Sequence, residues 1–175
     1  MNKYKKLLIG LNLLLVVSYF VYSIVQKEHL TKEGQLVLLR LAPVDPRSLM
    51  QGDYMNLRYA ISREMPDSII KKRGYCIVEL DSNNVGHYVR LQADNTCNKN
   101  EYALSYLKGG WRGLTIGAES FFFEEGTAEY YEEAVYGGLK IDGNGNSLLI
   151  GLYNENRQKI QPVDSTSIEM SKLEN

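Results

Sequence analysis

The sequence predicts a mostly β (α+β) fold: a small twisted sheet or partly open β-barrel with one packed helix, preceded by a single N-terminal transmembrane helix. Three observations support this prediction. An uncharged apolar run covers residues 7–25, short segments of alternating apolar and polar residues follow it, and turn-forming Gly, Asn and Asp residues separate those segments. Tyrosine is also abundant, with 13 residues against 4 Phe and 1 Trp, which favours half-buried sheets.

The composition is that of a chain that can bury a core. Of the 175 residues, 44% are hydrophobic and 23% are charged, which is enough for one packed domain in addition to a membrane segment. The formal net charge is −1, so there is no basic excess that could follow a phosphate backbone. We therefore expect no nucleic-acid partner.

The N-terminal apolar run is long enough to cross a bilayer as a helix. Lysines within the first six residues precede it, which predicts that residues 1–6 are cytoplasmic and that the remainder is exported. A cleaved signal peptide is the alternative, but no alanine occurs before Ala42, so the usual small-residue cleavage site is missing. We interpret residues 7–25 as a retained transmembrane anchor.

The rest of the chain divides by polarity. Residues 26–34 are polar and are predicted to form a juxtamembrane linker, residues 35–161 an extracytoplasmic domain, and residues 162–175 a polar C-terminal tail. Within the anchor, Asn12 either hydrogen-bonds a neighbouring helix, as would fit a membrane partner, or is simply tolerated there.

The domain is predicted to begin with a strand and a proline-rich turn. Residues 35–42 place apolar side chains on both faces, as a central strand does. Pro43 and Pro46 follow, and their fixed φ and missing N–H groups exclude a central strand or helix interior there. Gly52 and Asp53 then suit a junction between turn and strand, because Gly adopts positive φ and Asp closes turns through its side chain.

A period-2 pattern follows this junction and predicts a half-buried strand. One face carries the apolar residues Met55, Leu57, Tyr59 and Ile61. The opposite face carries Tyr54, Asn56, Arg58, Ala60 and Ser62. By the same alternation Asp53 points toward the rim of the core, where a carboxylate needs a partner such as a nearby arginine.

The segment Gly52-Asp53-Tyr54-x-x-Leu57-x-Tyr59 resembles the signature of the GDYXXLXY family of bacterial membrane-anchored proteins. The Pro-Val-Asp-Pro-Arg run before it and residues 117–126 are also similar to that family. The resemblance implies one N-terminal anchor in the bacterial inner (cytoplasmic) membrane, a small domain outside the cytoplasm, and a polytopic membrane protein as partner. It implies no established activity, so Asp53 and Tyr54 are expected to organise either the fold or an interface.

The remaining elements are predicted as two hairpins, a strand and a helix. Residues 75–80 pair with residues 87–91, and residues 139–141 pair with residues 147–153, where Gly151 indicates a bulge. A short apolar element at residues 102–107 lies between these hairpins. Residues 114–123 are predicted to be a strand that ends in three consecutive Phe. Such a strand either packs on one side and meets another surface on the other, or is buried between a sheet and a helix. Residues 127–136 have apolar residues at helical spacing and predict a helix capped by Thr127.

Two cysteines, Cys76 and Cys97, follow the membrane segment and leave two alternatives open. Outside the cytoplasm they can form a disulfide, or they can remain free thiols. Metal and cofactor sites are not expected. The Asp142-x-Asn144-x-Asn146 spacing is similar to a calcium loop, but Ser147 replaces the required Gly and Tyr153 the bidentate acid, so this segment predicts a hairpin turn.

A membrane-surface hydrolase is the sharpest catalytic alternative. The segment around Gly52 and Asp53 is similar to the one that follows the nucleophile in bacterial signal peptidases, which use a Ser-Lys dyad. Val44 occupies the nucleophile position here, and Ser48, the remaining candidate catalytic residue, has no assignable lysine as its base.

The sequence therefore favours a non-catalytic accessory subunit or interaction module of a polytopic membrane protein in the bacterial envelope. The alternatives are a divergent hydrolase and a ligand-sensing domain with a pocket lined by tyrosines. A closed apolar cavity would indicate the sensor.

Overall fold

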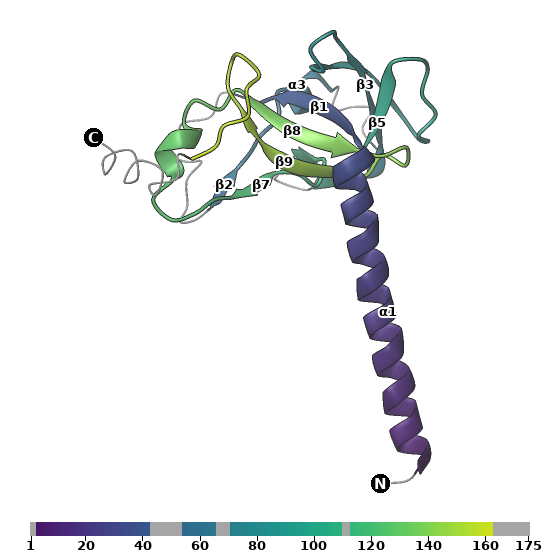
Figure 1. Ribbon diagram of the computed structural model, residues 1–175. Helices are drawn as coiled ribbons and strands as arrows, with labels where there is room; N and C mark the ends of the chain where they lie inside the picture. Colours follow the sequence, from purple (N-terminus) through teal and green to yellow (C-terminus); the bar gives the residue numbers. More distant parts are fainter. Residues whose placement is uncertain (1–2, 43–53, 66–70, 110–112, 163–175) are drawn as a thin grey trace, which may run out of the picture. The chain divides into compact units, whose positions relative to one another are not determined.

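The structure is a computed structural model that describes residues 3–42, 54–65, 71–109 and 113–162. The chain divides into two compact units, Met1–Gly34 and Gln35–Asn175. The first unit is a single helix, α1 (Lys3–Glu33), drawn as one unbroken coil in Figure 1. It is long and apolar enough to cross a membrane, as a signal anchor or a signal peptide would be.

Helix α1 does not end where the apolar run ends. The polar residues 26–34, expected as a linker, continue the helix to Glu33. Pairs one turn apart support this extension: Lys32 Nζ lies 2.6 Å from Glu28 Oε1, and the Thr31 hydroxyl donates to the Lys27 carbonyl at 2.8 Å. Gly34 alone separates the helix from the first strand.

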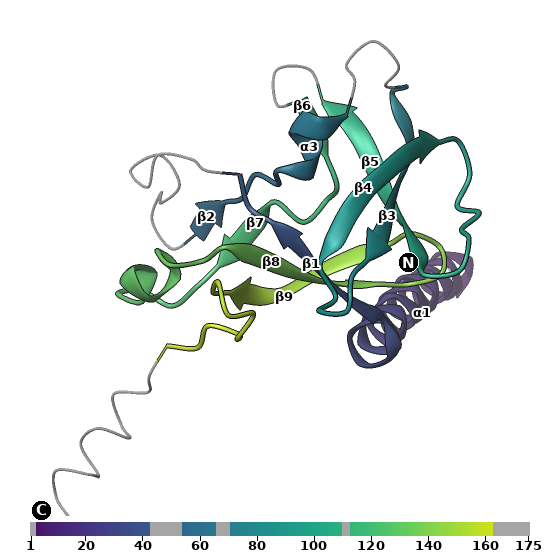
Figure 2. The same ribbon diagram turned by 90° about the horizontal axis from the view of Figure 1, so that it is seen from above.

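The second unit is mostly β, as predicted, and its described residues form three antiparallel sheets, which are open. One sheet has the order β1-β8-β9, the second β2-β7, and the third β4-β3-β5-β6 (Figure 2). The described residues contain the strands β1 (Gln35–Arg40), β2 (Tyr54–Asn56), β3 (Arg73–Leu80), β4 (Gly86–Gln92), β5 (Glu101–Gly109), β6 (Gly113–Thr115), β7 (Ser120–Phe122), β8 (Tyr136–Ile141) and β9 (Ser147–Tyr153).

Both predicted hairpins are confirmed. Strand β3 pairs with β4, with Cys76 opposite Leu91, and β8 pairs with β9. The second hairpin has a register shift beside Gly138, which lies opposite Gly151, the residue expected at a bulge. The ring of Tyr153 fills the space where a side chain at Gly138 would lie, so glycine permits the close approach of strand and ring.

Strand β1 differs from its expected place. Val37, Leu38 and Leu39 are almost fully buried on both faces, as a central strand would be, yet β1 lies at the edge of its sheet. Its free edge is covered by neighbouring segments: Leu38 N–H donates to Asn84 O at 2.8 Å, and Leu41 forms a bridge with Tyr59. The burial therefore comes from contact between sheets.

The prediction of a helix at residues 127–136 is wrong. Only a 3₁₀ turn, η1 (Ala128–Tyr131), forms, and the Thr127 hydroxyl donates to Glu124 O at 2.7 Å without capping a helix. Val135 explains the difference, because its N–H donates to Tyr153 O and its carbonyl accepts from Leu41 N–H. These sheet hydrogen bonds outweigh the weak helical tendency of so short a segment. The packed helix is instead one turn at α3 (Ile61–Glu64), with Ile61 buried.

The strand predicted over residues 114–123 is also interrupted. Gly117 adopts a φ of +80°, which β strands of L-residues do not allow, and the chain passes from β6 in the four-stranded sheet to β7 in the two-stranded sheet. The buried side chains between the sheets form one core, which includes Val37, Leu39, Leu57, Tyr59, Cys76, Val78, Leu104, Leu139, Ile141 and Leu152.

Candidate functional site: the two faces of the signature strand

Strand β2 holds the described part of the signature and pairs with the aromatic strand β7. Tyr54 lies opposite Phe122, Met55 opposite Phe121, and Asn56 opposite Ser120. The pairing continues beyond β2, because Leu57 N–H donates to Glu119 O at 2.6 Å. The signature strand and the later segment that also resembles the family, within residues 117–126, are therefore brought together as one antiparallel ribbon.

The inner face of the signature strand is part of the core. Met55, Leu57, Tyr59 and Ile61 are 2%, 3%, 3% and 5% exposed, as the alternating pattern predicts. Burial of a leucine or methionine side chain stabilises the fold by about 1.5–3 kcal/mol relative to exposure. On this face the signature acts as a packing motif.

Tyr59 also makes a specific polar contact. Its hydroxyl donates to the Ala118 carbonyl at 2.6 Å, in a buried position. Burial, and secondly the carboxylate of Glu119, raise the pKa of Tyr59 above its ordinary value, so the phenol stays protonated and remains a donor. A Cβ at Gly137 would lie 2.9 Å from the Tyr59 ring, so the ring packs directly on the β8 backbone.

The turn that receives this hydrogen bond is held by its own contacts. The Glu119 carboxylate accepts from the Ile116 backbone N–H across the left-handed Gly117. The Ile116 carbonyl in turn accepts from the Ser147 hydroxyl at 3.0 Å, which ties the turn to β9. Tyr59 therefore joins the signature strand to a turn that two other contacts already fix.

The outer face of the ribbon carries an exposed aromatic pair. The rings of Tyr54 and Phe122 are 5.7 Å apart with planes 36° from parallel. Phe122 is 74% exposed and Tyr54 is half-buried. We call these two residues the aromatic pair. Its position agrees with the expectation that the Phe-rich strand packs on one side and presents the other.

The neighbouring Phe residues point the other way. Phe121 and Phe123 pack on the buried Tyr131 of η1, with ring centroids 4.9 and 5.7 Å from the Tyr131 ring. Both belong to the partly buried layer against the core. Phe122 is thus held outward by two inward-facing neighbours, because successive side chains of a strand alternate between faces.

Several sequence-predicted residues lie outside the described residues. These are Gly52 and Asp53 of the signature, the nucleophile candidate Ser48, and Val44 at the signal-peptidase nucleophile position. Their expected roles stay predictions. Among the described residues, no group of three or more His, Cys, Asp or Glu side chains is arranged to hold a metal ion.

The two cysteines are free thiols in the structure and differ in environment. Cys76 lies in β3 and is fully buried, and burial together with Glu64 raises the pKa of its thiol to about 12. Cys97 is exposed in the loop before β5, and partial burial followed by Glu101 raises the pKa of its thiol. Neither thiol has the depressed pKa of a reactive nucleophile.

Sequence reasoning missed an ion pair that fixes the loop between β4 and β5. Arg90 binds Glu101 through two hydrogen bonds, at 2.6 and 2.8 Å, and Glu101 also accepts from the Asn98 N–H at 2.9 Å. These contacts, with that of Arg90 first, lower the pKa of Glu101 to about 2. The sequence offered no local signal for this pair, because Arg90 lies on a predicted strand, Glu101 lies in a segment expected to be a loop, and β3 separates β4 from β5 in the sheet.

A shallow depression lies at the β3–β5–β6 side of the domain. It encloses about 460 Å³ and is lined by Arg73, Gly74, Tyr75, Ala93, Ser105, Tyr106, Leu107, Thr115, Ile116 and Gly117. It is open to solvent, whereas the ligand-sensor alternative requires a closed apolar cavity. Among the lining residues, the Tyr106 hydroxyl lies close to Gly74, where an added Cβ would be 2.8 Å from it.

Comparison with known proteins agrees with the signature. Neither the curated proteins nor the solved structures include a match to this chain. A family model described as GDYXXLXY protein matches residues 16–152, which takes in most of α1, the signature and the sheets up to β9. The chain therefore belongs to the GDYXXLXY family.

Proposed function

We propose that this protein is a non-catalytic accessory subunit of a polytopic membrane protein in the bacterial inner membrane. Helix α1 is the retained anchor, with its N-terminus in the cytoplasm, and the β-rich unit works outside the cytoplasm. The aromatic pair, Tyr54 and Phe122, forms the centre of the contact with the partner.

The observation that carries the proposal is the division of the signature between two faces. Leu57 and Tyr59 are buried in the core, whereas Tyr54 is half-buried and its ring lies against the exposed Phe122. A ring that is 74% exposed leaves a large apolar area in water, and aromatic residues are enriched at protein–protein contacts. A family motif that needed only a core would not require an outward aromatic residue at this place.

The tether supports a partner at the membrane. Helix α1 has 31 residues, or about 46 Å at 1.5 Å per residue, against a hydrocarbon layer of about 30 Å. Gly34 alone joins the helix to β1, so the chain offers no long linker with which to reach a distant protein. A partner embedded in the same membrane fits this short reach.

The test is purification of the tagged full-length protein from its native membrane in mild detergent, followed by mass spectrometry. We expect a stoichiometric polytopic protein that is retained by the wild type and lost from Phe122→Ala and Tyr54→Ala. Tyr130→Ala is the matched control, because Tyr130 is an exposed tyrosine, 43% accessible, outside the aromatic pair.

Thermal melts of the same variants separate loss of contact from loss of fold. Unchanged melting with lost association supports the proposal. Association that survives in both Tyr54→Ala and Phe122→Ala places the contact elsewhere. A wild-type protein that purifies alone contradicts the accessory-subunit function itself.

A further inference from the structure

Polar side chains gather on one side of the apolar helix α1. Asn12, Tyr19, Ser23 and Gln26 follow one another at spacings of seven, four and three residues. At 3.6 residues per turn these spacings place all four within about 60° of the helix circumference. We call them the polar stripe. Ser18, the remaining serine of the apolar run, lies on a different side of the helix.

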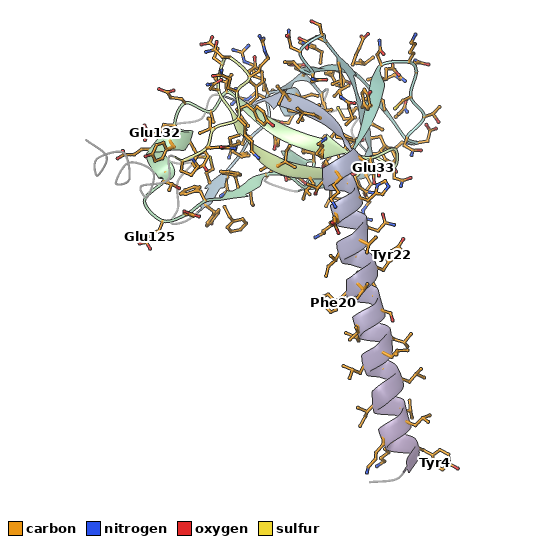
Figure 3. The ribbon with its side chains drawn as sticks, viewed as in Figure 1. Tyr4, Phe20, Tyr22, Glu33, Glu125 and Glu132 are labelled. Carbon is orange, nitrogen blue, oxygen red and sulfur yellow. The ribbon has the colours of Figure 1, made fainter. Side chains whose placement is uncertain are left out.

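The polar stripe reaches deep into the segment that would lie in hydrocarbon. The 19 residues of the apolar run measure about 28 Å, and Asn12 and Tyr19 lie about 6 and 4.5 Å on either side of its middle. Tyr4 and Tyr22, labelled in Figure 3, lie near the two ends of the run, where tyrosines favour the membrane–water interfaces. This register places the Asn12 amide away from both interfaces.

A side-chain amide in hydrocarbon needs a hydrogen-bond partner, because burying one without a partner costs several kcal/mol on transfer scales. Gln26 has a local partner, since its Nε2 donates to the Tyr22 hydroxyl at 2.8 Å. Asn12 is exposed on the helix surface and has no such partner within the described part of the chain, and none of the apolar window of α1 is buried by the protein itself. A polar group on a second helix would supply this missing partner.

We propose that the polar stripe binds the same stripe of a second copy of this chain, so that the anchors form a parallel dimer in the membrane. The inference rests on the proposed function only in requiring that α1 is retained. Two copies of one chain insert in the same direction, so each residue of a symmetric dimer faces itself at the same depth.

The chemistry of the polar stripe suits this self-pairing. The Asn12 amide carries donors and an acceptor, and the hydroxyls of Tyr19 and Ser23 can each donate and accept, so each group can satisfy its own copy. A charged residue would instead repel its copy, and residues 7–25 contain none. A single Asn on a helix–helix seam is also a known way to fix register in parallel dimers.

The test is cysteine cross-linking of the full-length protein in its native membrane. Cys97→Ser removes the exposed thiol, and the remaining Cys76 is buried in β3. In this background Ser23→Cys places a thiol on the polar stripe. Val21→Cys is the matched control at nearly the same depth, because it lies two residues away on the opposite side of the helix. A membrane-permeant oxidant is then applied.

We expect a disulfide-linked species of twice the chain mass from Ser23→Cys, and at least several-fold less from Val21→Cys. Adding Asn12→Leu to Ser23→Cys should reduce the dimer several-fold. Equal cross-linking of both cysteines, or none from Ser23→Cys, overturns the dimer. An adduct of Ser23→Cys with a different membrane protein also overturns it, since the polar stripe then belongs to that partner.

Intact-mass measurement separates this inference from the proposed function. A full-length chain that gives no dimer refutes only the dimer, and the association test with Phe122→Ala still stands. A mature chain that lacks α1 refutes the dimer and the anchored accessory subunit together.

Discussion

The inner and outer faces of the signature strand have different roles: the inner face packs in the core, and the outer face lies at the surface of the domain. On the inner face, Leu57 and Tyr59 are 3% exposed and contact the core, the Ala118 carbonyl and the β8 backbone. On the outer face, Tyr54 contacts Phe122, whose ring is mostly in water. One short motif therefore combines residues that hold the domain together with a residue left available at its surface. The contrast predicts that substitutions on the two faces separate stability from association.

The largest expected effect is that of Leu57→Ala. Truncating a buried leucine leaves a cavity, and the free energy of unfolding should fall by about 2–5 kcal/mol. Denaturant unfolding of the full-length protein in detergent measures this change. Asn56→Ala, one residue away on the exposed face, is the control and should change stability by about 0.5 kcal/mol or less. Equal effects of the two substitutions would contradict the division into faces.

Tyr59→Phe should have the next largest effect. The ring stays in place, but the Ala118 carbonyl loses its donor, and an unsatisfied buried polar group costs about 1–3 kcal/mol. The same unfolding measurement tests this, with Tyr54→Phe as the control for loss of a hydroxyl on the outer face. A Tyr59→Phe variant as stable as the wild type would show that the hydroxyl is not needed to hold the turn.

The aromatic pair should contribute little to stability. Cross-strand pairs at exposed positions contribute roughly 0.2–1 kcal/mol, so a double-mutant cycle of Tyr54→Ala and Phe122→Ala should give a coupling free energy in that range. The two single variants should nevertheless lose the proposed membrane partner. A coupling energy well above this range would make the outer face a structural feature as well.

The smallest expected effect is a loss of stability at acidic pH. It arises at the Arg90–Glu101 ion pair, away from the signature. Arg90 holds the pKa of Glu101 at about 2, below its ordinary 4.5, so the folded state binds a proton less readily than the unfolded state. The stabilisation is present above about pH 4.5 and is lost as the pH falls toward 2. The melting temperature of the wild type should therefore fall more across this window than that of Arg90→Ala. Tyr54→Ala should keep the wild-type acid response.

Local patterns in the sequence predict much of the fold. The β3–β4 and β8–β9 hairpins follow from alternating residues on either side of turn-forming segments. The burial of Met55, Leu57, Tyr59 and Ile61 follows from period-2 spacing. Helix α1 is evident from its uncharged run, although polar residues up to Glu33 extend it by pairs of side chains one turn apart.

The features that depend on distant contacts could not be predicted in this way. The segment after Thr127 has helical spacing, but Val135 accepts a backbone hydrogen bond from Leu41 and donates one to Tyr153, which draws the segment into the sheet. The aromatic pair requires the β2–β7 pairing between segments far apart in sequence, and nothing local specifies that partner. From the sequence alone, Tyr54 could serve either the fold or an interface, and its contact with the exposed Phe122 became apparent only with the pairing.

The pairing of β1 with β8 has a consequence for how the domain is made. Gln35 lies opposite Ile141, about a hundred residues later in the chain, so β1 is synthesised long before its partner strand. During that interval Val37, Leu38 and Leu39, which are almost fully buried in the finished domain, have no sheet to cover them. The β3–β4 hairpin can form early from local contacts. Strand β1 can pair only after β8, the second-last of the described strands, has been synthesised. The unfinished domain is therefore most prone to aggregation at β1, its first strand, until β8 has emerged.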